Sequence, residues 1–171
     1  SPLPPFHGFW MISRRAALKS SLSFAGAAFF LSRHPKAIGF TSPNARPRIG
    51  VVGSGSRWYI RATGINADYG SAPQMRRYGD YVAVCDVDSR RRDMASKIVK
   101  DWTGNDPSTM LDYRKLLDDD SIDIVHISTP DHWHAKIAIE AMLAGKDVYC
   151  EKPMTLTIEE GRQICDVCKR T

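Results

Sequence analysis

The chain has 171 residues, of which 43% are hydrophobic and 25% are charged. This length allows one domain with a leader segment, and this composition is that of a globular protein, not of a disordered one. The formal net charge is +5, and such a basic balance is common in proteins that bind nucleic acids. The distribution of the basic residues decides whether that class applies.

The basic excess lies in residues 1–47, which contain no Asp or Glu. The basic residues of this segment are Arg14, Arg15, Lys19, Arg33, Lys36 and Arg46. Removing these six from the 24 Lys and Arg residues leaves 18 against 19 acidic residues from Arg48 onward, a net charge of −1. The domain itself has no charge excess that would attract a phosphate backbone, so we expect no nucleic-acid partner.

The first residues resemble an export leader. Residues 1–10 are a proline-rich upstream extension, and Met11 begins a basic stretch that is followed by a mostly apolar run at Ser20–Leu31. This run is shorter than the about 20 residues that a membrane-spanning helix needs. A basic region followed by a short apolar region is typical of a signal peptide.

The paired arginines within Ser13–Lys19 indicate the type of signal, because they resemble the twin-arginine motif, with Ala17 where a Phe is common. We predict a twin-arginine signal over residues 11–41 and a periplasmic location. The alternative is a basic amphipathic segment that stays attached to a cytoplasmic protein. Residues 42–47 are turn formers and make a linker to the domain at residues 48–171.

Within that domain, apolar runs that predict strands alternate with periodic stretches that predict helices. The predicted strands are Arg48–Gly53, Tyr81–Asp86, Asp123–Ser128 and Lys146–Cys150. The predicted helices are Trp58–Asn66, Ser89–Trp102, Tyr113–Leu117 and His134–Ala144. A last helix begins after Thr157, which forms a capping box with Glu160. Ala67–Asp80 is predicted to be a loop. This alternation implies an α/β fold with a doubly wound parallel sheet, covered by helices on both faces, whose ligands bind at the carboxyl ends of the strands.

A glycine loop follows the first strand. Its candidate cofactor-binding residues are Gly53, Ser54, Gly55, Ser56, Arg57 and Trp58. Gly53 permits a tight turn, and Gly55 lets a pyrophosphate approach the backbone beside the positive end of a helix. Trp58 stands where the dinucleotide-binding pattern has a third glycine, and the alternative is a glycine turn without a ligand.

Asp86 ends the second strand, where a carboxylate accepts hydrogen bonds from both hydroxyl groups of an adenosine ribose. It lies 33 residues after Gly53, more than the usual spacing of about 20, and the loop Ala67–Asp80 explains the excess. The negative charge of Asp86 disfavours a 2′-phosphate, so we expect NAD as the cofactor. NADP is the alternative cofactor, because Arg90 and Arg91 lie a few residues after Asp86 in the sequence.

A polar turn, Ser128–His134, follows the third strand. Its candidates for contact with the nicotinamide ribose are Thr129, Pro130, Asp131 and His134. The carboxylate and the two imidazoles of this turn would also allow a metal site. Side chains at positions i and i+2 of a helix start rarely converge on one ion, so we expect no metal.

The next strand ends at Glu151, Lys152 and Pro153, which are further cofactor-site candidates. A lysine in this position is well placed to be buried or to lie near a cationic nicotinamide ring, and either environment favours its neutral form. Lys152 is therefore the candidate catalytic acid or base. The alternative is an ordinary surface lysine.

The four cysteines predict no special chemistry. Cys85 and Cys150 lie in strand-like apolar runs, and Cys165 and Cys168 form a C-x-x-C pair in a helical stretch. No second pair of Cys or His lies at the spacing of a zinc site, so we expect buried structural thiols.

The ordered motifs G-x-G-x-R, V-A-V-C-D, S-T-P-D-H-W-H and C-E-K-P resemble the N-terminal NAD(P)-binding Rossmann domain of the glucose–fructose oxidoreductase, inositol dehydrogenase and MocA family, over Arg48–Thr171. The resemblance implies that Lys152 is the acid or base near the reacting carbon and that its bond to Pro153 is cis. It matches Asp131 and His134 to a P-N-x-x-H turn, with Asp in place of the usual Asn.

The resemblance also implies hydride transfer between nicotinamide and a hydroxyl carbon of a sugar or polyol, in a homo-oligomer whose second α/β domain binds the substrate. Since the chain stops at Thr171, we expect a Rossmann domain without its last strand and without the substrate domain. Two alternatives are a truncated, non-catalytic nucleotide-binding module and an NAD-assisted glycoside hydrolase of the same family. Such hydrolases generally differ at the Glu-Lys-Pro position, so Lys152 favours the dehydrogenase.

Overall fold

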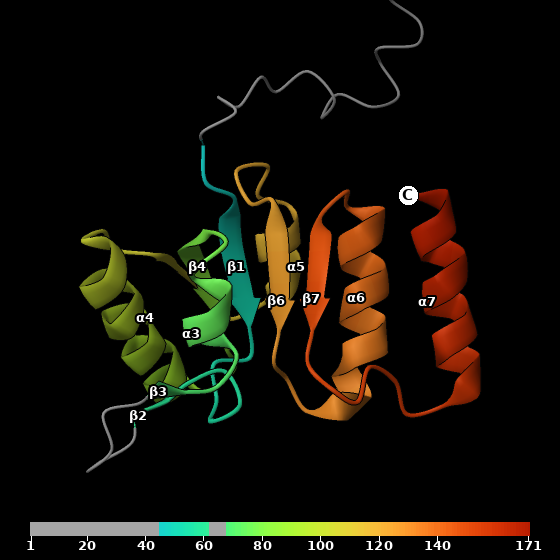
Figure 1. Ribbon diagram of the computed structural model, residues 1–171, viewed down its shortest axis with the longest axis horizontal. Coiled ribbons are helices and arrows are strands. Elements are labelled where there is room, and N and C mark those ends of the chain that lie inside the picture. The colour runs from blue at the N-terminus through green and yellow to red at the C-terminus, as the bar shows by residue number, and fades with distance from the viewer. Residues whose placement is uncertain (1–44, 62–67) are drawn as a thin grey trace, which may run out of the picture. The chain divides into compact units, whose positions relative to one another are not determined.

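A five-stranded sheet forms the centre of the computed structural model, which describes residues 45–61 and 68–171 (Figure 1). The strands are β1 (Arg48–Val52), β4 (Asp80–Cys85), β5 (Ser108–Met110), β6 (Ile124–Ile127) and β7 (Asp147–Cys150). They lie in the order β5-β4-β1-β6-β7, and every neighbouring pair is parallel. The predicted parallel α/β fold is confirmed. The predicted export signal lies outside the described residues.

Helices cover both faces of this sheet. They are α3 (Ala72–Met75), α4 (Ser89–Thr103), α5 (Tyr113–Leu117), α6 (His134–Leu143) and α7 (Ile158–Arg170), with a 3₁₀ helix, η2, at Asp131–Trp133. None of these described helices is long and apolar enough to cross a membrane. Helices α5, α6 and α7 form one core cluster with the sheet, and α3 and α4 form another. Val51 belongs to the second cluster and Val52 to the first, because successive side chains of a strand point to opposite faces.

The sequence signals at the helix ends are largely confirmed. The hydroxyl of Thr157 accepts the backbone N–H of Glu160, and the Glu160 carboxylate accepts the N–H of Thr157, so the capping box of α7 forms as predicted. Gly145, with a φ of 72°, follows the end of α6. At α4 the capping side chain is that of Asp88, one residue before the predicted cap Ser89.

The segment after the glycine loop differs from the prediction of a helix at Trp58–Asn66 and a loop at Ala67–Asp80. The structure has two short antiparallel strands, β2 (Ile60–Arg61) and β3 (Asp68–Tyr69), followed by the four-residue helix α3. The helix prediction is wrong for Trp58–Arg61, and residues 62–66 lie outside the described residues. The predicted stretch contains a glycine and several β-branched residues, which favour turns and strands over helices.

The packing of Trp58 is a second reason for this difference. Trp58 is 1% exposed and packs in an aromatic cluster with Tyr59, Tyr81 and Trp102. The rings of Trp58 and Tyr81 meet edge to face, with centroids 5.7 Å apart. The guanidinium of Arg76 lies over the Trp102 ring at 4.9 Å. The side chain that replaces the third glycine is thus a core residue and does not line the cofactor site.

The expectation of buried thiols is wrong for two of the four cysteines. Those in the strands are buried or half-buried, but Cys165 and Cys168 are exposed on α7. The helix buries Ile164 and Val167. Each exposed cysteine directly follows one of these buried residues, so the helical rotation turns it away from the core.

Replacing Trp58 by Ala in the 171-residue chain should lower the free energy of unfolding by about 3–5 kcal/mol, the usual cost of removing a buried aromatic side chain. Chemical denaturation followed by circular dichroism measures this change. Trp133→Ala is the matched control, because Trp133 is 42% exposed and its removal should cost about 1 kcal/mol or less. Equal effects of the two substitutions would contradict the core role of Trp58.

Candidate cofactor site

The close approach of two turns at the carboxyl edge of the sheet defines the site. At the end of β1, Gly53 has a φ of +85°, a conformation that suits glycine. A Cβ atom at Gly53 would lie 2.7 Å from the backbone N of Thr129 and 2.8 Å from the carbonyl carbon of Ser128. Only a residue without a side chain therefore lets the end of β1 meet the turn after β6.

Asp86 lies directly after β4, as predicted, and is only 8% exposed. Its Oδ2 accepts hydrogen bonds from the backbone N–H of Ser54 at 2.8 Å and from the Ser54 hydroxyl at 3.1 Å. Its Oδ1 accepts the N–H of Asp88 at 2.9 Å. A carboxylate has about four acceptor sites, so these three bonds leave room for one further donor. The geometry fits one ribose hydroxyl, where we expected two.

The glycine loop is joined to the turn after β7. Ser56 and Arg57 at the end of the loop are exposed. The Nε atom of Arg57 lies 3.9 Å from Oε2 of Glu151, and this same oxygen accepts the backbone N–H of Lys152 at 3.3 Å. One carboxylate thus connects the phosphate-binding loop predicted from the sequence with the candidate catalytic lysine.

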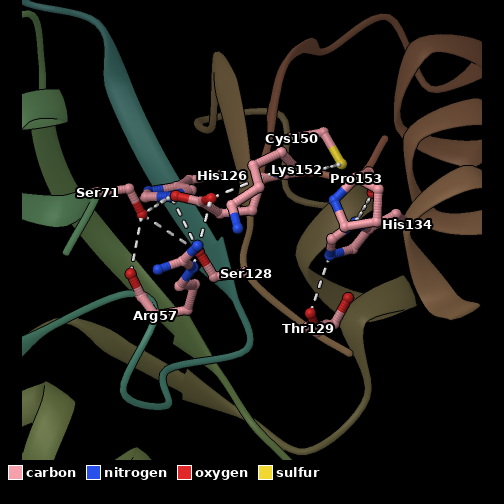
Figure 2. Close-up of polar contacts among 10 residues, drawn as sticks. Arg57, Ser71, His126, Ser128, Thr129, His134, Cys150, Lys152 and Pro153 are labelled. Atoms are coloured by element: carbon pink, nitrogen blue, oxygen red, sulfur yellow. Dashed lines mark hydrogen bonds and ion pairs between the residues drawn. The ribbon is translucent and has the colours of Figure 1, made fainter. Parts of the chain in front are cut away.

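A buried polar network contacts the end of the glycine loop at Arg57 (Figure 2). His126 in β6 is fully buried, with its Nδ1 2.5 Å from the Tyr81 hydroxyl and its Nε2 2.8 Å from the Ser71 hydroxyl and 3.1 Å from that of Ser128. The Ser71 hydroxyl donates to the carbonyl oxygen of Arg57 at 3.4 Å. Burial lowers the pKa of His126 to about 3, so the ring is neutral near pH 7 and donates one N–H. This network was not predicted from the sequence. Its one signal there is His126, a polar residue inside an apolar run.

The turn after β6 holds an unsatisfied polar atom. The Oγ1 atom of Thr129 is buried and has no hydrogen-bond partner within residues 45–61 and 68–171. Pro130 and Asp131, which follow at the start of η2, are exposed. The Thr129 hydroxyl can therefore bond to a ligand, and the Asp131 carboxylate is accessible to one.

His134, whose contact with a ribose stays a prediction, has partners within the protein. It is 1% exposed, and its Nδ1 lies 2.7 Å from the carbonyl oxygen of Pro153 and its Nε2 2.9 Å from that of Thr129 (Figure 2). The ring bridges the turns after β6 and β7 and positions both of them. Within the described parts of the chain, no group of three or more His, Cys, Asp or Glu side chains is arranged to hold a metal ion.

The peptide bond between Lys152 and Pro153 is cis, as the resemblance implied. Glu151 is half-buried, but Lys152 is exposed. The side chain of Lys152 is therefore not buried by the described residues, although we had expected it to be. Lys152 follows β7 at the same sheet edge at which Gly53 follows β1. The arrangement brings the candidate proton carrier to the edge where ligands of parallel sheets bind.

These residues fit a dinucleotide. Gly55 presents loop backbone without a side chain where a pyrophosphate would approach, and Asp86 keeps one acceptor for a ribose hydroxyl. The buried Oγ1 of Thr129 lacks a partner that a ligand hydroxyl would supply.

Sequence relatives of the chain include hydrolases of the same family. A glycosyl hydrolase family 109 protein of Shewanella baltica (strain OS155) is 47% identical over 97 residues, which are 52% of this chain and 20% of that protein. An α-N-acetylgalactosaminidase of Shewanella oneidensis is 46% identical over 97 residues, with the same two coverages of 52% and 20%. The chain thus spans about a fifth of the length of these curated relatives.

Solved structures with the same fold include dehydrogenases. The myo-inositol 2-dehydrogenase of Lactobacillus plantarum is 26% identical, with a TM-score of 0.53, and the match covers 73% of this chain and 33% of that one. The WlbA dehydrogenase of Bordetella pertussis, solved with NADH and UDP-GlcNAcA, is 24% identical, with a TM-score of 0.55 and coverages of 73% and 34%. At this identity the second match shows the fold alone.

The model of a protein family described as an oxidoreductase family with an NAD-binding Rossmann fold matches residues 47–171. This match covers the whole sheet and all the site residues described above. The chain therefore belongs to the glucose–fructose oxidoreductase, inositol dehydrogenase and MocA family, and residues 47–171 are its NAD-binding oxidoreductase domain.

Proposed function

We propose that this domain serves a dehydrogenase that transfers a hydride between the nicotinamide C4 and a carbinol carbon of a sugar, cyclitol or related polyol. The observation that carries the proposal is the position of Lys152 at the edge of the sheet that also carries Gly53 and Asp86, with the link through Glu151 to the glycine loop. Bound NAD supplies the hydride acceptor, and the residues of the chain orient it and handle the proton.

Each group has one task in this scheme. The glycine loop and Asp86 bind the pyrophosphate and the adenosine ribose, and Thr129 offers its hydroxyl to the nicotinamide ribose. The amine of Lys152 accepts the substrate hydroxyl proton at Nζ and returns it in the reverse direction. His134 keeps the turn of the lysine in place through the carbonyl of Pro153.

The sugar or polyol class is supported by the similarity to a myo-inositol 2-dehydrogenase, whose name gives a cyclitol as its substrate. The chain spans 33% of that structure. We propose that a second domain of a longer protein supplies the substrate contacts and that the complete enzyme is a homo-oligomer.

An NAD-assisted glycoside hydrolase is the second candidate, because the curated relatives are glycosyl hydrolase family 109 proteins that are 47% identical over the matched 97 residues. The intact Lys152 favours the dehydrogenase. The two activities differ in their cofactor balance: a dehydrogenase makes one NADH for each polyol oxidised, whereas a hydrolase releases a sugar with no net change in NAD. Absorbance of NADH, followed beside the release of nitrophenol from a nitrophenyl N-acetylgalactosaminide, separates them.

The 171-residue chain should bind NADH more tightly than NADPH, because the Asp86 carboxylate accepts a ribose hydroxyl and repels a 2′-phosphate. Asp86→Ala should narrow the difference in binding free energy by about 1–2 kcal/mol, the scale of a hydrogen bond to a charged group. Ser54→Ala is the control, since it removes one bond to Asp86 and leaves the charge, so the difference should persist. Calorimetry that shows a clear preference for NADPH in the wild-type chain would overturn the assignment.

Lys152→Ala should lower turnover by about 10²–10⁴-fold in a protein that includes the substrate domain, the usual contribution of general acid–base catalysis. Lys152→Arg should be about as inactive, because a guanidinium keeps the charge but does not release its proton. The affinity for NADH should change far less in both variants, since the glycine loop and Asp86 lie elsewhere. Near-normal turnover of either variant would remove Lys152 from the mechanism.

We also propose export by the twin-arginine route, which the sequence of residues 11–41 supports. Met11–Thr41 fused to a reporter that folds before transport should carry it into the periplasm. Changing both Arg14 and Arg15 to Lys should stop the transport. Transport that is unchanged in the double-lysine variant would instead favour another route or a leader that stays attached.

A further inference from the structure

Within the described residues, the glycine loop leads into a turn and the strand β2, and not directly into the helix that normally follows such a loop. In dinucleotide-binding folds the pyrophosphate lies at the amino end of that helix, whose positive dipole balances part of its charge. Here Ser56–Trp58 form a turn that leads into β2, and the short helix α3 begins only at Ala72. The negative charge of a bound pyrophosphate therefore needs another positive partner.

Arg91, in the first turns of α4, lies against this loop. A Cβ atom at Gly55 would lie 3.2 Å from Nη1 of Arg91 and 3.7 Å from its Cζ, with no other heavy atom as close. The guanidinium thus occupies the side of Gly55 where the lack of a side chain leaves room for a phosphate. Both residues line an open groove of about 560 Å³, whose other polar lining residues include Ser56, Lys97 and Asp101.

The arginines on either side of Arg91 have partners in the protein. Arg90 pairs with the Asp88 carboxylate at 3.3 Å, and Arg92 donates to the carbonyl oxygen of Asp86 at 2.8 Å. Within residues 45–61 and 68–171, no carboxylate lies at ion-pair distance from Arg91. An exposed guanidinium without an acidic partner, in contact with a glycine loop, is suited to an anionic ligand.

We propose that Arg91 binds the pyrophosphate of the dinucleotide and replaces the missing helix end as its positive partner. The inference rests on the proposed binding of NAD by this domain. A planar guanidinium donates two parallel hydrogen bonds to phosphate oxygens, and Arg91 reaches the loop from α4 without moving the backbone. The alternative phosphate, the 2′-phosphate of NADP, is the other outcome that the experiment distinguishes.

The test is the affinity of the 171-residue chain and its variants for NADH and NADPH, measured by calorimetry. Arg91→Ala should raise the Kd for both dinucleotides by a similar factor of about 10–100, the range for a lost hydrogen bond between charged groups. Arg91→Lys should recover part of this affinity, because it keeps the charge. Arg90→Ala is the matched control on the same helix, and it should change the NADH Kd by about twofold or less.

Salt concentration provides a second readout. If Arg91 neutralises phosphate charge, the NADH affinity of the wild-type chain should fall more steeply with added salt than that of Arg91→Ala. An unchanged NADH Kd in Arg91→Ala, a loss confined to NADPH, or an Arg91→Lys variant no better than Arg91→Ala would each overturn the inference. A wild-type chain that binds neither dinucleotide would instead overturn the proposed function, so the two failures can be told apart.

Discussion

The contact between the backbone of Gly53 and the turn at Ser128–Thr129 is the constraint on which the site depends. Any side chain at Gly53 would meet backbone atoms at 2.7–2.8 Å, and backbone has little freedom to give way inside a paired sheet. This contact brings the end of β1 to the turn after β6, and His134 extends the same edge to the turn after β7. The bonds of Ser54 to Asp86 add the end of β4. Four strand ends thus form one surface.

Much of this arrangement follows from short-range rules that a sequence displays. The apolar runs separated by helical periodicity predicted the parallel sheet, since strands buried on both faces do not alternate in polarity. The capping box at Thr157 and the glycine at Gly145 marked helix ends because their chemistry is local. The places of Asp86 and Lys152 at strand ends followed once the strands were assigned, since parallel strands present their carboxyl ends on one edge.

The features that the sequence did not predict depend on contacts between distant residues. Trp58 was assigned to a helix, but its packing with Tyr81 and Trp102 turns the chain into a different path. The partners of Asp86 and His134 inside the protein were not visible either, because hydrogen bonds across 19 and 32 residues leave no periodic signal. These unpredicted contacts change the roles of site residues: His134 positions two turns, and Asp86 keeps one free acceptor. We propose that Arg91 supplies the positive partner that a helix directly after the glycine loop would otherwise provide for the pyrophosphate.

In the proposed complex, one sheet edge binds the dinucleotide across the glycine loop, with the nicotinamide ring beside Lys152. The most direct measurement is a crystal structure of the chain with NADH. We expect the pyrophosphate to lie beside Gly55 and to accept hydrogen bonds from the Arg91 guanidinium, one adenosine ribose hydroxyl to donate to Asp86, and the nicotinamide ring to lie next to the Lys152 amine. Density for NADH away from the glycine loop, or a nicotinamide ring at the edge opposite Lys152, would contradict it.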